Sequence, residues 1–136
     1  HYFAINTVLP MLWIKQLVGF FPSEHSTLTV LSARVGSIED NGLGGWYGYR
    51  ASKAALNMLL RNVGIEMNRR NDQAFAIGVH PGTVDTPLSK PFQGNVPEGR
   101  LFDPERAALQ LLDVIEDLKV PDSGKLFDYE GREIAF

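Results

Sequence analysis

The sequence of 136 residues contains no cysteine, so it can form neither a disulfide nor a thiolate zinc site. Its three histidines, His1, His25 and His80, are scattered without the spacing of metal ligands, and we expect no metal site. Disulfides belong mainly to oxidising compartments, and the absence of cysteine therefore fits a protein of the reducing cytoplasm.

The sequence also lacks a surplus of positive charge and a long apolar run. Its formal net charge is −3, and acidic and basic residues alternate without a block of one sign. Binding to nucleic acid or to a membrane surface normally needs a basic patch, so we expect neither partner. No apolar stretch approaches the roughly 18 residues of a membrane-spanning helix.

The first residues of the chain lack the marks of a natural N-terminus. The segment from His1 to Thr7 has the composition of a helix interior, with no initiating Met and no capping residue before it. The length suits one domain. We therefore expect a piece of a longer protein, in which residues 1–136 form a single partial domain.

Helix-forming and strand-forming stretches alternate along the chain. Residues 3–20 have helical spacing interrupted by Pro10, which predicts a kink or a helix that restarts there. Asp103 as N-cap and Pro104 at the first helical position predict a helix that continues to about residue 118. The other predicted elements are a loop over 21–25, strands over 27–32, 74–79 and 124–129, a glycine-rich connection over 36–48, a helix over 49–70 and an irregular segment over 87–103.

The predicted elements follow the order helix, strand, helix, strand, helix, strand. Near-continuous apolar strands separated by helices predict a parallel sheet with helices on both faces, which is the α/β class. A sheet of three strands would leave one long edge bare, and a bare edge is prone to aggregation. This too suggests that strands preceding residue 1 are missing.

Tyr49 and Lys53 stand four residues apart on the predicted helix over 49–70. This spacing places the phenol and the ammonium on one helix face, with their Cβ atoms ~5–6 Å apart. A free tyrosine has a pKa of ~10. A lysine cation ~4 Å away stabilises the phenolate by about 4 kcal/mol at an effective dielectric constant of ~20, or roughly three pKa units. The pair therefore predicts a general acid–base catalyst that works near neutral pH.

The same pair has a plainer interpretation. A tyrosine four residues before a lysine occurs by chance in about one chain in four of this length. On this interpretation Tyr49 is an exposed residue at the start of a helix and Lys53 is solvated. The spacing alone does not decide between the two.

Three blocks of the sequence resemble one protein family in content, order and separation. They are the glycine-rich segment that leads into Tyr49-x-x-x-Lys53 and Ala54-Ala55-Leu56-Asn57, the segment Pro81-Gly82-Thr83-Val84-Asp85-Thr86-Pro87, and Asn6 in the opening helix. Together they resemble the short-chain dehydrogenase/reductase family over essentially all 136 residues. Residues 36–47 and 127–131 are most similar to its carbonyl-reductase and C-factor-like subgroup.

The resemblance covers only the second half of that family's fold. It implies the C-terminal part of a doubly wound, Rossmann-type parallel sheet, represented by its last three strands and their flanking helices. The family's glycine-rich dinucleotide fingerprint belongs to the absent N-terminal half. The implied cofactor is NADP or NAD, and the subgroup favours NADP. Pairing through the opening helix and the tyrosine helix is common in the family and implies a homo-oligomer, either a dimer or a tetramer.

The resemblance also implies roles for individual residues. Tyr49 would donate a proton to the substrate carbonyl oxygen as the nicotinamide delivers hydride to the carbon. Lys53 would lower the pKa of Tyr49 and bind the ribose, and Asn6 would hold a water that links Lys53 to solvent. The implied cofactor-binding residues are Tyr49, Lys53, Pro81, Gly82, Val84 and Thr86. Taken without the family, Asn6 is a polar residue inside a helix, and Pro81-Gly82 is a turn that ends a strand.

One position departs from the family's pattern. Ala33 stands where the family has its catalytic serine, three residues before Gly36. Ser32 is not a simple replacement, because neighbouring strand residues point to opposite faces. Ser37 lies in the loop that leads to Tyr49, and we expect its hydroxyl to polarise the carbonyl instead. Loss of one oxyanion donor typically costs ~10²–10³ in rate, so an uncompensated alanine would leave a feeble enzyme.

Three hypotheses for function follow. The leading one is an oxidoreductase that interconverts a small-molecule carbonyl and an alcohol, and the intact Tyr49, Lys53 and Asn6 favour it. The second is a short-chain-reductase fold used for binding or signalling, with weakened chemistry, and Ala33 favours it. The third is an inert fragment.

The segments on either side of the predicted catalytic helix bear on the substrate. Trp46 and Tyr47 either line the substrate pocket or pack their loop against the core. Residues 88–103 resemble the family's substrate lid in position, and their composition names no substrate.

Overall fold

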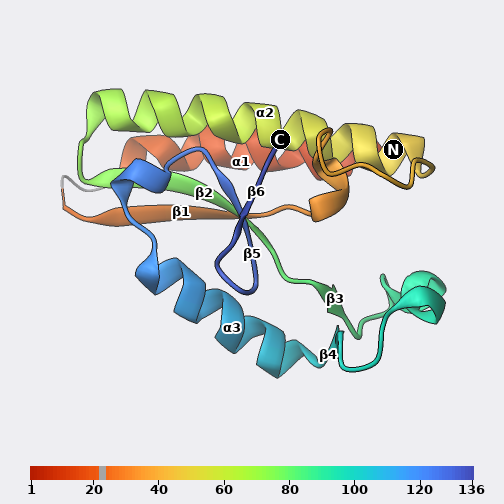
Figure 1. Cartoon of the computed structure of the whole chain (residues 1–136). Coiled ribbons are helices and arrows are strands. Elements are labelled where there is room, and N and C mark those ends of the chain that lie inside the picture. Colours follow the sequence, from red (N-terminus) through yellow and green to blue (C-terminus); the bar gives the residue numbers. More distant parts are fainter. Residues whose placement is uncertain (22–23) are drawn as a thin grey trace.

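Figure 1 shows the computed structural model, which describes residues 1–21 and 24–136. Pro22 and Ser23 of the predicted loop lie outside the described residues. The helices are the π-helical η1 (Ala4–Val8), α1 (Leu9–Leu17), α2 (Tyr47–Arg70), α3 (Pro104–Asp117) and the short 3-10 helices η2 (Val18–Phe20), η3 (Arg34–Gly36), η4 (Lys90–Asn95) and η5 (Val120–Asp122). The strands are β1 (Ser26–Leu31), β2 (Ala74–His80), β3 (Thr83–Val84), β4 (Leu101–Phe102), β5 (Leu126–Asp128) and β6 (Glu133–Ile134).

The main sheet has four strands in the order β1-β2-β5-β6. β1 pairs in parallel with β2, with Leu31 beside Val79, and β2 pairs in parallel with β5. The predicted mixed α/β class with a parallel sheet is therefore confirmed. β6 was not predicted; it pairs antiparallel with β5 after the chain reverses at Gly131, whose φ is 75°.

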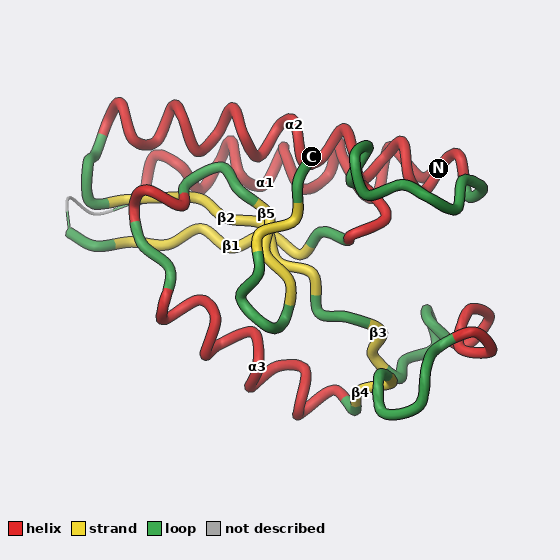
Figure 2. Tube along the Cα trace, in the orientation of Figure 1, coloured by secondary structure: helices red, strands yellow, loops and turns green. Residues whose placement is uncertain are grey.

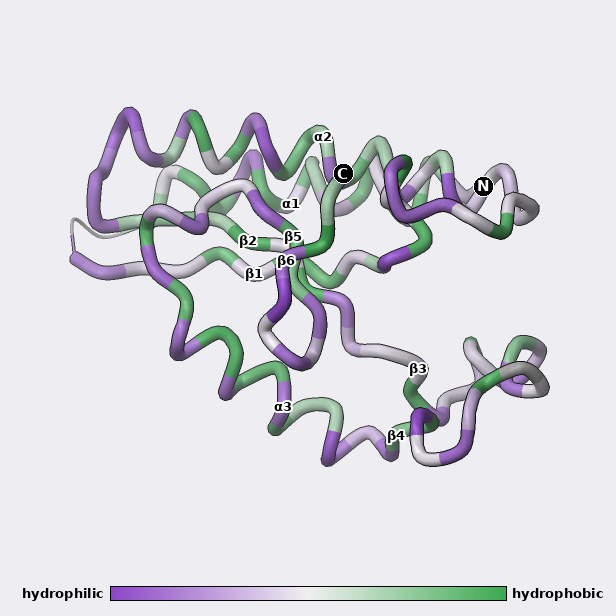
Figure 3. The backbone as a smooth tube through the Cα atoms, in the orientation of Figure 1, coloured by the Kyte–Doolittle hydropathy of each residue, from purple (hydrophilic) through white to green (hydrophobic). Residues whose placement is uncertain are grey.

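Helices cover both faces of this sheet: α1 and α2 lie on one face and α3 on the other (Figure 1). The side chains of β2 alternate between these two layers, as a doubly covered strand requires. Ala74 and Ala76 belong to the core cluster beneath α1 and α2, and Phe75, Ile77 and Val79 belong to the cluster beneath α3. The hydropathy of α3 alternates along its length in Figure 3, as expected of a helix with one buried face.

The opening helix continues through Pro10 without a break, and the turn before the proline is π-helical. The predicted alternative of a helix that restarts at Pro10 is therefore wrong. The Leu9 N–H donates to the Ala4 carbonyl oxygen, a bond five residues back that defines the π-helical η1. Regular α1 then runs on with Pro10 in its first turn, where proline needs no N–H bond. The wide turn places Asn6 and Thr7 toward α2.

The segment after β2 is more regular than the sequence predicted. β3 pairs in parallel with β4, and η4 lies between them. η4 lies at the far end of this segment, away from the main sheet (Figures 1 and 2), whereas Phe102 of β4 is buried against the Tyr129 ring. The prediction of an irregular segment over 87–103 is therefore wrong for η4 and β4, whose short lengths give no periodic signal.

α3 begins as predicted. The Asp103 carboxylate accepts a hydrogen bond from the Arg106 N–H at 3.0 Å, and Pro104 occupies the first turn. Its last residue is Asp117, one residue before the predicted end.

Candidate functional site

One face of α2 lies along the carboxyl end of β1, and it carries the predicted acid–base pair. Tyr49, Lys53 and Asn57 follow one another at four-residue spacing on this face. The Lys53 ammonium donates to the Leu31 carbonyl oxygen at 3.2 Å. The Ser32 hydroxyl donates to the Asn57 side-chain oxygen at 2.6 Å, with both residues buried. The helix face and the strand end are thus joined by two side-chain bonds.

The turn after β1 packs directly onto this helix face. A Cβ atom on Gly36 would lie 2.8 Å from the Lys53 Cβ and 2.8 Å from the Lys53 carbonyl carbon. The Arg50 guanidinium donates to the Val35 carbonyl oxygen at 3.2 Å. Only glycine permits so close an approach, so the residue just before Ser37 lies directly against Lys53.

Asn6 is joined to the turn of α2 that runs from Tyr49 to Lys53. Its side-chain amide donates to the Ser52 hydroxyl at 3.1 Å, and Ser52 in turn donates to the Tyr49 carbonyl oxygen at 2.8 Å. Thr7 holds the two helices together by donating to the Ser52 carbonyl oxygen at 2.8 Å. The structure therefore brings Asn6, Tyr49 and Lys53 to one region, through a serine that the sequence analysis missed.

Burial sets the acid–base properties of the pair. It raises the pKa of Tyr49 above its usual value and lowers the pKa of Lys53, because each charged form loses contact with water. For Tyr49 this direction is opposite to the lowering that the sequence predicted from the lysine cation. The Lys53 ammonium is hydrogen-bonded to the Leu31 carbonyl oxygen at the end of β1. The pKa of Tyr49 is set by desolvation of the phenol, which raises it.

Ala33 and its neighbouring serines occupy distinct surroundings. Ala33 is extended, with φ of −153° and ψ of 145°, and it is buried. Ser32 points to Asn57, which agrees with the prediction that it does not take the place of residue 33. The buried Ser37 hydroxyl accepts a hydrogen bond from the Asp40 N–H at 2.9 Å. A catalytic role for Ser37 stays a prediction.

The segment from Pro81 to Thr86 leaves the carboxyl end of β2, at the same sheet edge as Ala33. Gly82 has a φ of 75°, and a Cβ there would lie 2.8 Å from the Phe102 ring and 3.0 Å from the Tyr129 ring. The Val84 carbonyl oxygen accepts a hydrogen bond from the Ser89 hydroxyl, and the Thr86 N–H donates to the same hydroxyl at 3.2 Å. The turn is thus held by packing on one side and by Ser89 on the other.

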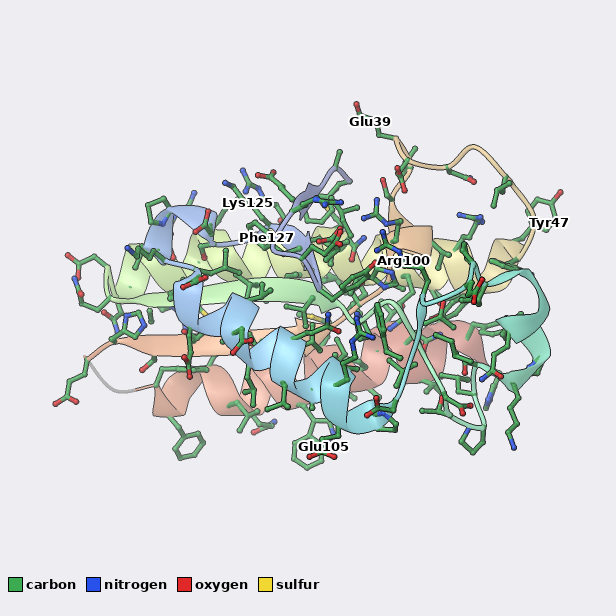
Figure 4. All side chains as sticks on the ribbon, turned by 60° about the horizontal axis from the view of Figure 1, so that its bottom comes forward. Glu39, Tyr47, Arg100, Glu105, Lys125 and Phe127 are labelled. Carbon is green, nitrogen blue, oxygen red and sulfur yellow. The ribbon has the colours of Figure 1, made fainter. Side chains whose placement is uncertain are left out.

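The two aromatic residues before Tyr49 differ in their surroundings. Tyr47 is 85% exposed and points outward at the start of α2 (Figure 4). Trp46 adopts a left-handed backbone conformation with φ of 48°, which costs a non-glycine residue about 1–2 kcal/mol. Its indole meets the Phe92 ring edge-on at 5.5 Å and lies 5.6 Å from the Arg50 guanidinium. Trp46 therefore links the helix start to η4.

His80 ends β2 beside the turn that begins at Pro81. Burial, and after it the Arg34 cation, lower the pKa of His80 from 6.5 to about 4, against the opposing pull of Asp128 and Asp40. Within 1–21 and 24–136, the His80 Nδ1 is buried without a hydrogen-bond partner. The imidazole is therefore held neutral.

This neutral histidine makes stability depend on pH. Between pH 6.5 and 4 the unfolded chain binds a proton at His80 that the folded chain does not, so stability falls as the pH drops through this window. The whole shift of the His80 pKa corresponds to a loss of up to about 3 kcal/mol in the free energy of unfolding. We expect His80→Gln to lose less free energy of unfolding over the window than the wild type, measured by urea denaturation of the full-length protein. The exposed His25→Gln is the control, and an equal loss in all three proteins would contradict the assignment.

Residues 1–21 and 24–136 contain neither a metal-binding cluster nor a helix that could span a membrane. No group of three or more histidine, aspartate or glutamate side chains there is placed to hold a metal ion. None of the helices in those ranges combines the length and apolar character needed to cross a bilayer.

Known proteins resemble the chain along most of its length. It is 35% identical over 127 residues to 1-hydroxy-2-glutathionyl-2-methyl-3-butene dehydrogenase of Rhodococcus sp. (strain AD45), covering 93% of the chain and 54% of that protein. It is 32% identical over 135 residues to C-signal of Myxococcus xanthus, covering 98% of the chain and 76% of that protein. No protein-family model matches the chain.

The chain belongs to the short-chain dehydrogenase/reductase family. Among solved structures of this family, the NADPH-bound carbonyl reductase from chicken fatty liver superposes with a TM-score of 0.78 at 27% identity, covering 98% of the chain and 55% of that protein. The carbonyl reductase Sniffer of D. melanogaster superposes with a TM-score of 0.80 at 23% identity, a likeness of fold.

The short-chain dehydrogenase/reductase fold is present here in part. The chain spans about half the length of the Rhodococcus dehydrogenase and of the chicken carbonyl reductase. Its parallel sheet corresponds to part of the family's Rossmann fold, as the sequence predicted. The segments around Ala33, Tyr49 and Pro81 all lie at the carboxyl edge of that sheet, where ligands bind in folds of this kind.

Proposed function

We propose that the full-length protein is an NAD(P)-dependent oxidoreductase that interconverts a carbonyl and an alcohol, with Tyr49 as the general acid–base residue. The observation that carries the proposal is the convergence of Tyr49, Lys53 and Asn6 on one turn of α2, at the carboxyl edge of the sheet. Chance spacing on an exposed helix would not leave both side chains half-buried, and it would not tie this turn of α2 to β1 and η1.

In this proposal Tyr49 carries the proton. During reduction its hydroxyl gives the proton to the substrate carbonyl oxygen, and during oxidation the phenolate takes it back. The phenol starts from a pKa that burial raises, so it is protonated in the chain at neutral pH and ready to act as an acid. The charge that develops on the phenolate needs a nearby cation, and Lys53 is one helical turn away.

The residues present fit a nicotinamide cofactor, whose chemistry when bound is to deliver or accept the hydride. The Lys53 ammonium has three N–H donors, and the bond to Leu31 uses one, which leaves donors for ribose hydroxyls. Pro81, Gly82, Val84 and Thr86 would hold the carboxamide, because their turn is fixed in place at the sheet edge. We favour NADP, since the chicken carbonyl reductase and a Burkholderia multivorans relative were solved with NADPH and NADP.

A binding or signalling protein is the second candidate function. Ala33 favours it, because the residue supplies no hydroxyl to a developing oxyanion. The relative in Myxococcus xanthus carries the name C-signal, and the chain covers 76% of it. In this alternative the protein would retain the short-chain-reductase fold and have little or no catalytic activity.

Lys53→Ala in the full-length protein tests the proposal. Because Lys53 serves both the phenol and the ribose, we expect the change to weaken binding of reduced cofactor by roughly 10–100-fold, the value of a hydrogen bond to a charged group. We also expect it to lower the rate of carbonyl reduction at saturating cofactor. Binding is measured by calorimetry and the rate by the absorbance of the reduced nicotinamide.

Lys119→Ala is the matched control, since Lys119 is an exposed lysine on the connection after α3. Unchanged cofactor binding and rate in Lys53→Ala would argue against the proposed site. Weaker binding without any reductase activity in the wild type would favour the binding protein.

We also propose that the full-length protein is a homodimer or homotetramer. Large apolar side chains on the outer side of α1 and on α2 are more than 50% exposed, among them Leu12, Trp13 and Met58. Burial of such side chains against a second copy is favourable, and a two-fold axis lets the same surface serve both subunits.

A further inference from the structure

A chain of charges links the loop that carries Ser37 to the end of the sheet. The Arg34 guanidinium donates from Nη2 to the Asp128 carboxylate at 2.8 Å and from Nη1 to the Asp40 carboxylate at 3.3 Å. Residues 34 and 128 are far apart in sequence, and residues 34 and 40 flank Ser37. One side chain therefore spans two separate anchors.

Asp128 is the fixed end of this series of ion pairs, which runs from Asp128 through Arg34 to Asp40. Its side chain is 4% exposed, and its Oδ1 accepts hydrogen bonds at 3.0 Å from the N–H groups of both Glu130 and Arg132. Its Oδ2 is the atom that binds Arg34. A carboxylate bound on both oxygens cannot turn, so Arg34 meets a rigid partner.

Asp40 is the end that reaches Ser37. Its carboxylate binds Arg34, and its N–H donates to the Ser37 hydroxyl at 2.9 Å. The Ser37 N–H donates to the Arg34 carbonyl oxygen at 2.9 Å. The hydroxyl is thus enclosed in a turn whose two ends, residues 34 and 40, are bridged by one guanidinium.

We propose that Arg34 is a positioning residue that holds the Ser37 hydroxyl in place for the carbonyl oxygen of the substrate. The inference rests on the proposed function, and it explains how a loop serine takes over from the alanine at position 33. The bond from Asp40 uses a lone pair of the Ser37 oxygen and leaves its proton to donate. Arginine suits the task because its planar fork reaches two carboxylates at once, whereas a lysine ammonium is a single point.

A double-mutant cycle on the full-length protein tests the inference. Ser37→Ala should lower kcat by on the order of 10²-fold, the usual cost of one oxyanion donor. Asp40→Asn should lower kcat by roughly 10-fold through misplacement of the hydroxyl, with the KM for reduced cofactor unchanged. The double variant Ser37→Ala/Asp40→Asn should be no slower than Ser37→Ala alone, because Asp40 acts through Ser37.

Arg34→Lys should recover part of the kcat lost in Arg34→Met.

Asp40→Asn is the primary variant because its side chain is 45% exposed, so the fold should tolerate the change. Arg34→Met removes the cation from the buried Asp128, and its folding is therefore checked by circular dichroism. The matched control is Arg132→Met, which breaks an ion pair of 2.7 Å with Glu130 on the turn after Asp128.

Amide hydrogen exchange gives a second reading that needs no activity. The Asp40 amide is protected by its bond to Ser37, so exchange of that amide should accelerate in Asp40→Asn and Arg34→Lys and stay unchanged in Arg132→Met. Additive losses of kcat in the cycle, or unchanged exchange at residue 40, would overturn the inference while leaving the role of Tyr49 intact. An inactive wild type would refute the proposed function, and the exchange result would still decide whether Arg34 orders the Ser37 loop.

Discussion

Tyr49→Phe in the full-length protein is expected to lower the rate of carbonyl reduction by about 10²–10⁴-fold, the usual contribution of general acid–base catalysis. The substitution removes the phenolic proton and keeps the ring, which lies 6.2 Å from the Tyr2 ring. Packing of α2 should therefore survive, and the affinity for reduced cofactor should change little. The rate is measured from the absorbance of the reduced cofactor and the affinity by calorimetry.

Tyr47→Phe is the control for this prediction. It makes the same chemical change two residues earlier, on a side chain that is 85% exposed. We expect its rate to match the wild type. Equal rates in Tyr49→Phe and Tyr47→Phe would rule out Tyr49 as the source of the proton.

Gly64→Ala is expected to destabilise the protein by about 1–3 kcal/mol, the range found for overpacked cores. In an ordinary helix the same change would stabilise by roughly 1 kcal/mol, because alanine has the higher helix propensity. Here a Cβ on Gly64 would lie 2.6 Å from the Gly124 backbone nitrogen and 2.9 Å from the Ser123 hydroxyl. The sign of the effect is therefore set by tertiary packing.

Ser123 and Gly124, which face Gly64, are held to β2 by hydrogen bonds and cannot easily move away. The Gly124 N–H donates to the Ala76 carbonyl oxygen at 2.6 Å, and the Ser123 hydroxyl accepts from the Ala76 N–H at 3.2 Å. Urea denaturation of the full-length protein measures the loss. Gly19→Ala, at a position with open space around its Cβ, should be close to neutral. A stabilised Gly64→Ala would show that α2 lies farther from the chain near Gly124.

Local signals predicted the elements that are long and periodic. The helix over 49–70 and the strands over 27–32 and 74–79 were found within two residues of their observed bounds. Each of these elements buries at least one of its faces in the core, so its apolar residues recur at a regular spacing along the sequence. The two-residue strands β3, β4 and β6 are too short to show such a pattern, and each depends on a partner strand elsewhere in the chain.

Contacts between distant residues escaped prediction. The bond of Ser32 to Asn57 depends on how α2 packs on β1, and the pair of Arg34 and Asp128 depends on the order of strands in the sheet. Asn57 did have a signal, since it continues the four-residue spacing of Tyr49 and Lys53. Arg34 had none.

The pKa of Tyr49 shows the same limit. From the sequence, the lysine one turn away was expected to dominate and to lower it. In the structure, burial of the half-buried phenol dominates and raises the pKa. Desolvation is a property of the packed molecule, so no spacing rule gives its size.

The most direct measurement of the central claim is the transfer of deuteride from reduced cofactor labelled at C4 of the nicotinamide to a ketone, catalysed by the full-length protein. Mass spectrometry of the alcohol locates the label. If the protein is the proposed oxidoreductase, deuterium appears on the carbinol carbon with the wild type, and Tyr49→Phe slows its appearance by the factor given above. Cofactor binding without any labelled alcohol would contradict the claim and leave a binding protein on a reductase fold.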